Sequence, residues 1–346
     1  MRSARIDPTF SILTTAYKTE PYLAETIESV LRQTRTDWEL IVVDNGYSDE
    51  MARIVSSYAR HDTRIRLIRQ ENRGVGGGVV AAAARARGRF FCVLNSDDLL
   101  MPEFCERVGA VIDAEPGVDA VGCDAELFDD RTGDLIGTHQ RSIGFKKRPV
   151  VRHRLTWTEA LAGRIPYYTG AVRREAWSAV RGYESSTATP EVEEDVVLWL
   201  CLVDAGFDVR LLPDRLCRFR QRENSLSHDP LQTEAFEQRL ERSFTVVAQA
   251  SGTPGSLAAA APAVRRLRYN QSLRRARWAF TDGDISAART AARDAFEHRH
   301  TARAAVVVAS LALAPRTLRS LHPAKQRLTY TLRRTTGRLT AAGRRA

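Results

Sequence analysis

Residues 10–46, FSILTTAYKTEPYLAETIESVLRQTRTDWELIVVDNG, decide the fold of this chain. Two short apolar segments rich in β-branched residues, 10–16 and 38–43, are typical of strands that are buried on both faces. The residues between them place apolar side chains at the spacing of one helix face, namely Leu23, Ile27, Val30 and Leu31. This strand–helix–strand order predicts a β-α-β unit with two parallel strands.

The same alternation continues as far as residue 98. The sequence predicts a helix near 49–60 capped by Ser48, a strand over 64–69, a glycine-rich loop over 74–78, a helix over 79–87 and a strand over 90–94. Strands that alternate with helices predict an α/β fold with a doubly wound, mostly parallel, Rossmann-like sheet. Such sheets bind ligands at the carboxyl ends of their strands, so polar residues there are candidate site residues.

The group Asn95-Ser96-Asp97-Asp98 directly follows the last of these strands. Carboxylates in this place can hold a hard cation such as Mg²⁺ or Mn²⁺ and leave room for phosphate oxygens. The cation would offset the charge of a diphosphate and stabilise it as a leaving group. A helix N-cap is the alternative, because Ser and Asp are common there.

Two further motifs lie at the ends of predicted strands. Asp44 could accept a hydrogen bond from a nucleotide base or a ribose hydroxyl, and a simple Asx turn is the alternative. The loop Gly74–Gly78 could bind phosphate through backbone N–H groups at a helix start. Its glycine spacing matches neither the dinucleotide-binding motif nor the P-loop motif, so the loop alone does not define a nucleotide site.

Acidic residues also open a strong helix predicted over 191–205, which Gly206 ends. A carboxylate of Glu193-Glu194-Asp195 could act as a general base on a hydroxyl acceptor. The alternative is a favourable interaction of these acids with the helix dipole. Further along, the arginines of FRQRENS, residues 219–225, could bind phosphate, or the segment could be a solvated loop.

The composition is that of an ordinary globular protein, with 43% hydrophobic and 27% charged residues in 346. We find no signal peptide and no apolar run of about 18 residues that would mark a membrane span. The five cysteines are odd in number and never form a CxxC pair, which argues against a secreted disulfide scaffold. These features predict a reduced, cytoplasmic protein.

Positive charge is concentrated in the C-terminal part of the chain. From Asp229 onward there are 21 Lys+Arg against 8 Asp+Glu, and after Glu297 there is no acid at all. Such asymmetry predicts a polyanionic partner, either an anionic membrane surface or nucleic acid. Tyr330 stands alone among the arginines of the tail, which is too few aromatic residues for base stacking, so we favour the membrane surface over nucleic acid.

This C-terminal region is predicted to be helical throughout. Amphipathic segments at 267–281 and 285–297 are joined by Asp282-Gly283-Asp284, which indicates a helix–turn–helix pair. The apolar stretch 304–314 is too short to span a bilayer and predicts a buried or interfacial helix.

Taken in order, the motifs resemble those of the family 2 glycosyltransferases with the GT-A fold. The resemblance covers roughly residues 9–227 and implies a GT-A domain over 1–227, followed by a basic helical region over 228–346. Within the domain, 9–118 would be the nucleotide-binding half and 119–227 the acceptor half. The matching segments are SILTTAYKTEPYLAETIESVLRQT, WELIVVDNGYSD, NRGVGGG, FFCVLNSDDLLMP and EEDVVLWLCLVDAGF.

The resemblance also implies roles for individual residues. Asn95-Ser96-Asp97 occupies the family's DxD position, so Asp97 would be the metal ligand, with Mn²⁺ or Mg²⁺ as the cofactor. Asp195 would be the general base, paired with Glu194 in the family's acidic motif. The residues that would bind the nucleotide sugar are Thr15 and Tyr17 at the base, Asp44 at the base or ribose, Asn72 and Gly74 beside the nucleotide, and Asn95 and Ser96.

Several positions depart from the family's pattern. Asn95 replaces the first acid of DxD, and Val79 and Val80 stand where the family often has Arg-Asn. Arg222 stands where many members have a histidine, two residues after Arg220. The absence of QxxRW argues against a processive polysaccharide synthase and favours addition of a single sugar. These departures also motivate an alternative, a catalytically inactive nucleotide-sugar-binding protein.

The predicted function is therefore that of an inverting glycosyltransferase of the hexosyltransferase class. It would move a sugar from a UDP-, GDP- or dTDP-sugar to a saccharide or lipid-linked acceptor by metal-assisted direct displacement. Its product would belong to a cell-surface polysaccharide or glycoconjugate. The predicted location is the cytoplasm, with the basic tail lying on the inner face of the membrane.

Overall fold

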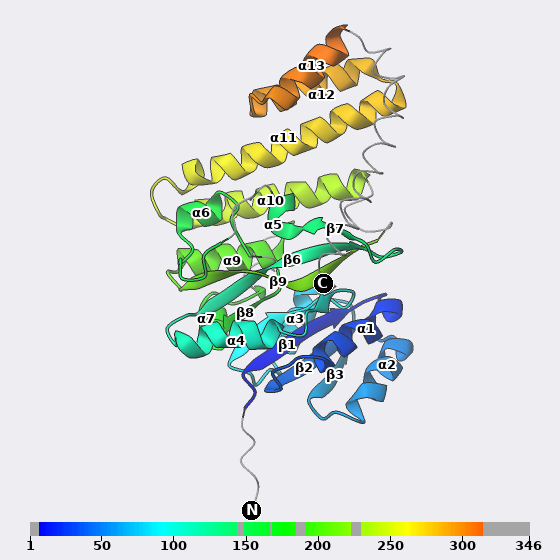
Figure 1. Ribbon diagram of the computed structural model, residues 1–346, viewed down its shortest axis with the longest axis vertical. Coiled ribbons are helices and arrows are strands. Elements are labelled where there is room, and N and C mark those ends of the chain that lie inside the picture. Colours follow the sequence, from blue (N-terminus) through cyan, green and yellow to red (C-terminus); the bar gives the residue numbers. More distant parts are fainter. Residues whose placement is uncertain are drawn as a thin grey trace, which may run out of the picture.

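The structure is a computed structural model of the chain, and it describes residues 7–143, 145, 149–166, 168–184, 191–222 and 230–313. One mixed sheet forms the lower part of the molecule, and a stack of helices lies above it (Figure 1). The strand order is β3-β2-β1-β4-β8-β6-β9-β5, and β7 pairs with β6. The strands are β1 Phe10–Ala16, β2 Trp38–Asn45, β3 Ile65–Gln70, β4 Phe90–Val93, β5 Leu99–Leu100, β6 Ala120–Asp129, β7 Leu135–Thr138, β8 Gly170–Arg173 and β9 Val209–Gln221.

The strands β1 to β4 pair in parallel, as the sequence predicts for a β-α-β-α-β-α-β unit. Beyond β4 the sheet is mixed, because β8 pairs antiparallel with both β4 and β6, and β5 pairs antiparallel with β9. The antiparallel pair of β5 with β9 brings Leu99 opposite Arg218. The end of β9 is thereby placed beside the polar group that precedes β5.

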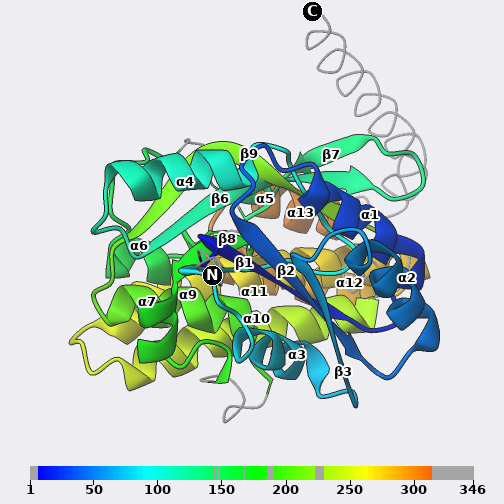
Figure 2. The same ribbon diagram turned by 90° about the horizontal axis from the view of Figure 1, so that it is seen from below.

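Helices cover both faces of the sheet, which confirms the prediction of an α/β, doubly wound fold. Alternate strand residues enter two separate cores: Ile12 shares a core with residues of α1 and α2, whereas Leu13 shares a core with residues of α3 and α9. Helices α1 and α2 lie on the opposite side of β1 and β2 from α3 (Figure 2). The helices before β9 are α1 Glu20–Leu31, α2 Asp49–Ala59, α3 Gly74–Ala83, α4 Phe104–Ala114, α5 His139–Ser142, α6 Trp157–Leu161, α7 Arg174–Ala179 and α9 Glu194–Asp204.

Local signals in the sequence explain where several helices begin and end. Ser48 caps α2 by accepting a hydrogen bond from the backbone N–H of Met51, as predicted. Gly206 adopts the left-handed conformation just beyond α9, at φ 81°. Gly283, at φ 91°, makes the turn that the sequence places between two C-terminal helices.

The glycine-rich segment differs from the prediction, because Gly74–Gly78 is the first part of α3 rather than a loop. Glycine is unfavourable inside a helix, but here it allows close packing. A Cβ on Gly78 would lie 2.2 Å from Cγ2 of Thr15, so no side chain fits between α3 and β1.

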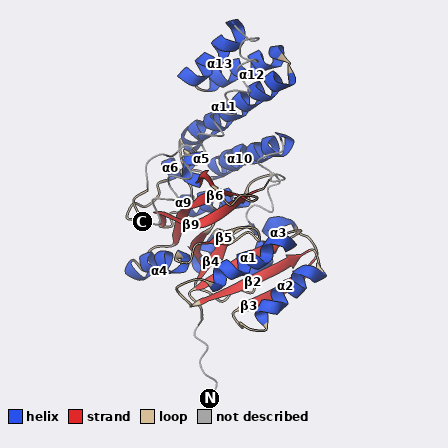
Figure 3. Cartoon of the chain, turned by 45° about the vertical axis from the view of Figure 1, so that its right-hand side comes forward, coloured by secondary structure: helices blue, strands red, loops and turns tan. Residues whose placement is uncertain are grey.

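From α10 onward the described chain is entirely helical (Figure 3). The helices are α10 Pro230–Ala250, α11 Ser256–Asp282, α12 Ile285–His298 and α13 Ala302–Leu313. The first two are not separate from the sheet, because Phe244 and Ala263 belong to the same apolar core as Leu13. None of the helices in the described ranges is both long and apolar enough to cross a bilayer. The basic tail over 315–346, for which we predict membrane contact, lies outside the described residues.

Candidate active site

The loop Asn95–Asp98 is held from the side of β8 and β9. The backbone N–H of Asn95 donates to Oη of Tyr168 at 2.9 Å, and Tyr168 donates to Oδ2 of Asp98 at 2.7 Å. The backbone N–H of Arg220 donates to Oδ1 of Asp98 at 2.9 Å. Burial and the nearby Asp98 carboxylate keep the pKa of Tyr168 well above its usual value, so its hydroxyl remains a donor. Asp98, which is buried, therefore fixes the loop.

Arg220 has a structural role rather than the phosphate contact that its segment suggested. Its side chain is 6% exposed and donates from Nε to the backbone oxygen of Asp97 at 2.8 Å. Its guanidinium also pairs with Asp130 at 2.9 Å and with Glu25. The ring of Tyr22 lies 4.9 Å from the guanidinium carbon. These partners tie α1, the loop and β9 together.

Asp97 forms an ion pair with Arg222, the residue that follows β9. The distance from Arg222 Nη2 to Asp97 Oδ2 is 2.7 Å, and the Arg222 guanidinium also lies 5.1 Å from the centre of the Tyr22 ring. Burial raises the pKa of Asp97, and the positive charge of Arg222 opposes this shift. The guanidinium thus lies at the carboxylate for which the sequence predicted a divalent cation.

The side chains around Asp97 do not form a set that suits a dedicated metal site. Both carboxylate oxygens of Asp98 accept hydrogen bonds, and the hydroxyl of Ser96 shares a hydrogen bond with Thr19 at 2.7 Å. Across the part of the chain that the structure describes, no group of three or more His, Cys, Asp or Glu side chains could hold a metal ion. Because Oδ2 of Asp97 is paired with Arg222, a cation at this carboxylate would lie beside a positive charge.

Asp44, the predicted contact of the base or ribose, is buried at the end of β2. Its Oδ1 accepts from the backbone N–H of Ser48 at 2.9 Å, and its Oδ2 accepts from Nε of Arg69 at 2.9 Å. Arg69 also reaches Asp49 at 2.9 Å. A ligand could therefore reach this carboxylate only if Arg69 moved aside.

Asn45 organises the segment between β3 and α3, a role that we did not predict. Its Nδ2 donates to Oδ1 of Asn72 at 3.1 Å and to the backbone oxygen of Gly74 at 2.9 Å. Its Oδ1 accepts from Nε2 of Gln70 at 2.7 Å and from the backbone N–H of Arg73 at 3.2 Å. Asn72 and Gly74, both predicted beside the nucleotide, are held through this one buried side chain.

Tyr17 and Thr15 occupy the end of β1. The ring of Tyr17 lies against Gly46, because a Cβ on that glycine would be 2.9 Å from Cδ2 of the ring, and 44% of Tyr17 is exposed. Thr15 packs against Gly78, and its hydroxyl is buried without a hydrogen-bond partner among the described residues. An exposed aromatic ring can stack on a ligand, and a buried hydroxyl without a partner could accept a hydrogen bond from one.

The acidic residues at the start of α9 lie close to α3, the helix that packs on Thr15. A Cβ built on Gly76 would lie 3.1 Å from Oε1 of Glu194. Burial, followed by the charge of Glu194, raises the pKa of Asp195 to about 6. Burial and the charge of Asp195 raise the pKa of Glu193 to about 7. Such raised values are typical of groups that exchange protons near neutral pH.

Helix α10 holds the beginning of α9 in place. Arg239 donates from Nε to Oε1 of Glu193 at 2.6 Å, and the backbone N–H of Glu193 donates to Oγ of Ser243 at 2.9 Å. Further along α9, the ring of Trp199 packs on Gly170 of β8, where a Cβ would be 2.9 Å from Cη2. The acidic helix and the Asn95–Asp98 loop thus share the support of β8 and of the chain that precedes it.

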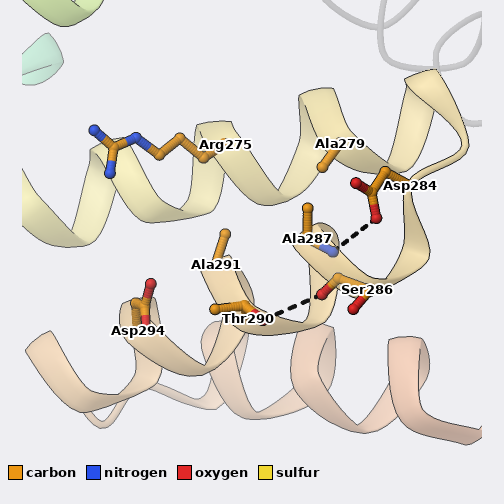
Figure 4. Close-up of a pocket in the computed structure, with 8 residues that line it drawn as sticks. All are labelled: Arg275, Ala279, Asp284, Ser286, Ala287, Thr290, Ala291 and Asp294. Carbon is orange, nitrogen blue, oxygen red and sulfur yellow. Dashed lines mark hydrogen bonds between the residues drawn. The ribbon is translucent and has the colours of Figure 1, made fainter.

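A hollow of about 460 Å³ lies elsewhere, between α11 and α12 (Figure 4). Arg275, Asp284 and Asp294 are among the residues that line it, together with alanines and small hydroxyl residues. None of the predicted site residues belongs to this hollow, so we do not assign the chemistry to it.

The chain has an α/β fold in which predicted site residues lie at the carboxyl ends of parallel strands, the place where sheets of this kind bind ligands. Residues 11–173 match the family model described as Glycosyl transferase family 2. Over these residues the chain is therefore similar to glycosyltransferase family 2 domains. The sequence resemblance to this family is confirmed.

Relatives from Bacillus subtilis (strain 168) agree with this family. The chain is 37% identical over 101 residues to EpsH, which is 29% of either protein. It is 29% identical over 218 residues to EpsE, which is 62% of this chain and 73% of that protein. Both are named as glycosyltransferases. The chain thus spans less than a third of EpsH and nearly three quarters of EpsE.

Solved structures share the fold at low sequence identity. The mannosyltransferase PcManGT from Pyrobaculum calidifontis, in complex with GDP-Man and Mn²⁺, is 17% identical, with a TM-score of 0.60 over 97% of this chain and 87% of that one. S. aureus TarS 1-349, in complex with UDP-GlcNAc, is 17% identical, with a TM-score of 0.56 over 87% of this chain and 84% of that one. Both support the GT-A-type fold.

Proposed function

We propose that the chain transfers a sugar from a nucleoside diphosphate sugar to a hydroxyl group of an acceptor, with inversion and with Asp195 as the general base. The observation that carries this proposal is the approach of Glu194, the neighbour of Asp195, to Gly76 in α3. Two residues further along α3, Gly78 packs on Thr15 at the end of β1. The acidic pair therefore lies beside the strand ends, where donors bind in sheets of this class.

The chemistry follows from the environment of Asp195. Its carboxylate would take the proton from the acceptor hydroxyl while the oxygen attacks the anomeric carbon, and the bond from that carbon to the diphosphate would break on the opposite side. A pKa of about 6 leaves the group mostly ionised at neutral pH and makes it a stronger base than an ordinary aspartate. Glu194 would position the acceptor or the base beside it.

The donor would lie across the ends of β1, β2 and β4. Tyr17 offers an exposed ring for the base, and its neighbours in the donor site would be Thr15, Asp44, Asn72, Gly74, Asn95 and Ser96. UDP-, GDP- and dTDP-sugars are the candidate donors, supported by the UDP-GlcNAc and GDP-Man named for the two structural relatives. We leave the Mn²⁺ or Mg²⁺ that the family resemblance implies out of this mechanism, because Asp97 is paired with Arg222.

The acceptor is proposed to be a saccharide or a lipid-linked saccharide, and the product a cell-surface polysaccharide or glycoconjugate. A cytoplasmic enzyme whose basic tail rests on an anionic membrane would suit a lipid-linked acceptor. The 11 Arg and Lys residues after Glu297 motivate this part of the proposal.

The test is a screen of the purified full chain against UDP-, GDP- and dTDP-sugars with a panel of saccharide acceptors. Release of the nucleoside diphosphate, together with mass-spectrometric detection of the extended acceptor, would support the proposal. Binding of a nucleoside diphosphate without any transfer or donor hydrolysis would instead favour a catalytically inactive nucleotide-sugar-binding protein.

A further inference from the structure

Arg222 pairs with Asp97, the residue that the family resemblance places beside the donor diphosphate. Its Nη2 is 2.7 Å from Asp97 Oδ2, and its side chain is 32% exposed, so the guanidinium remains open on one side. A guanidinium carries five N–H donors in a planar fork. The pair with Asp97 therefore leaves donors available for a second anion.

Arg220, the other arginine beside Asp97, is already engaged by other residues of the chain. Arg220 is 6% exposed, and its guanidinium is used by Asp130, Glu25 and the backbone oxygen of Asp97. Of these two arginines, Arg222 is therefore the one with donors left for a phosphate. Because Tyr22 flanks both guanidinium groups, the aromatic ring also limits the directions in which Arg222 can turn.

The side chains around Asp97 also favour a guanidinium over a divalent cation at this place. Asp98 and Ser96 have their polar atoms in hydrogen bonds, and Asn95 contributes an amide where an acid would strengthen cation binding. A divalent cation placed at Asp97 would also face the like charge of Arg222. A guanidinium group can donate two parallel hydrogen bonds to a phosphate, and it stays positively charged at every physiological pH.

We propose that Arg222, held by Asp97, supplies the positive charge at the donor diphosphate in place of a divalent metal, so that donor binding and transfer do not require one. This inference rests on the proposed glycosyl transfer. As the bond from the anomeric carbon to the diphosphate breaks, Arg222 would stabilise the negative charge that develops on the leaving phosphate oxygen.

The experiment measures binding of UDP and of GDP to the full chain by calorimetry, once in EDTA and once in excess Mn²⁺. We expect one of the two to bind in EDTA and Mn²⁺ to change its affinity by less than about threefold. Arg222→Gln should weaken binding in EDTA by about tenfold or more, the loss expected for a charged hydrogen bond. Arg215→Gln is the matched control, because Arg215 lies in β9, the strand that Arg222 follows, is 29% exposed and pairs with Glu126 instead. The affinity of this variant should equal that of the wild type.

A second variant keeps the test independent of any effect on folding. Arg222→His introduces a metal-binding side chain beside Asp97, so Mn²⁺ should restore at least part of the lost affinity, and thermal unfolding confirms that each variant is folded. The inference is overturned if the wild type binds the nucleotide only with Mn²⁺, or if Arg222→Gln binds it normally in EDTA. In either case nucleotide binding, and with it the proposed function, would stand. Failure of the wild type to bind UDP, GDP or, in the same measurement, dTDP under both conditions would overturn both.

Discussion

The carboxylate of Glu193, at the start of α9, accepts a 2.6 Å hydrogen bond from Arg239 of α10. This contact joins the helical C-terminal part of the chain to the acidic motif of the proposed active site. Arg239 lowers the pKa of Glu193, while burial and the charge of Asp195 raise it to about 7. The protonation state of Glu193 therefore depends on Arg239, a residue of α10 that lies outside the sheet.

Arg239→Gln should raise the pKa of Glu193 further and loosen the beginning of α9. We expect kcat to fall by roughly tenfold, because α9 also carries the proposed base Asp195 and the loosened helix no longer holds it in place. The measurement is the pH dependence of kcat for donor turnover. Arg242→Gln is the control, because its pair with Glu191 at 3.3 Å is exposed and contributes little. If kcat and its dependence on pH are the same in Arg239→Gln and Arg242→Gln, Arg239 has no role in the active site.

Asp195→Asn should stabilise the fold at alkaline pH. The pKa of Asp195 is about 6 in the folded state against an ordinary value of 3.8, so the folded chain holds this proton more tightly than the unfolded chain does. The corresponding stability is present below pH 3.8 and is lost as the pH rises through about 6. Asparagine avoids the buried charge, so the Tm of the variant should exceed that of the wild type by about 2 °C at pH 8 and by less near pH 4. Thermal unfolding at the two pH values measures this, and a lower Tm at pH 8 would refute it.

Gly78→Ala should destabilise the chain because the new methyl group would lie 2.2 Å from Thr15 Cγ2. Overpacking of this kind costs about 1–3 kcal/mol, partly offset by the better helix propensity of alanine. Urea denaturation measures the change. Gly117→Ala serves as the control, since nothing lies within 4 Å of a Cβ there, and it should alter stability by no more than about 0.5 kcal/mol. A Gly78 variant as stable as this control would show that α3 can move away from β1.

Asn45→Ala should affect both stability and nucleotide binding. It removes a buried side chain that bonds to Gln70, Asn72, Arg73 and Gly74, so the free energy of unfolding should fall by about 1–3 kcal/mol. Because Asn72 and Gly74 lose their positions, the affinity for UDP or GDP should fall as well. Gln70→Ala removes just one of these bonds and should have a smaller effect on both measurements. Unchanged nucleotide affinity in Asn45→Ala would show that the segment between β3 and α3 does not belong to the donor site.

Much of the sheet could be predicted from the sequence, because its first strands are buried on both faces and are separated by helices with clear periodicity. The caps and turns at Ser48, Gly206 and Gly283 also follow from local chemistry. The prediction of a loop over Gly74–Gly78 is wrong, because local propensity disfavours a glycine-rich helix and the reason for this one is tertiary. Helix α3 packs so closely on Thr15 that larger side chains would clash.

Contacts between distant residues account for what the sequence could not predict in the site. Arg69 covers Asp44 from the neighbouring strand, and Tyr168 fixes the loop that contains Asp97 from 70 residues away in sequence. Arg239 lies beyond the boundary that we drew at 227, yet it touches the acidic motif. The polar clusters themselves could be found because strand ends in parallel sheets have a recognisable pattern, whereas the partners of each side chain depend on the packing of the whole domain.

The most direct test of the proposed reaction is the turnover of a donor and acceptor pair by Asp195→Asn in the full chain. General bases contribute about 10²–10⁴-fold to the rate, so kcat should fall by at least about a hundredfold while the affinity for the nucleoside diphosphate stays within about threefold of the wild type. Turnover by Asp195→Asn close to that of the wild type would contradict the assignment of the base and the mechanism built on it.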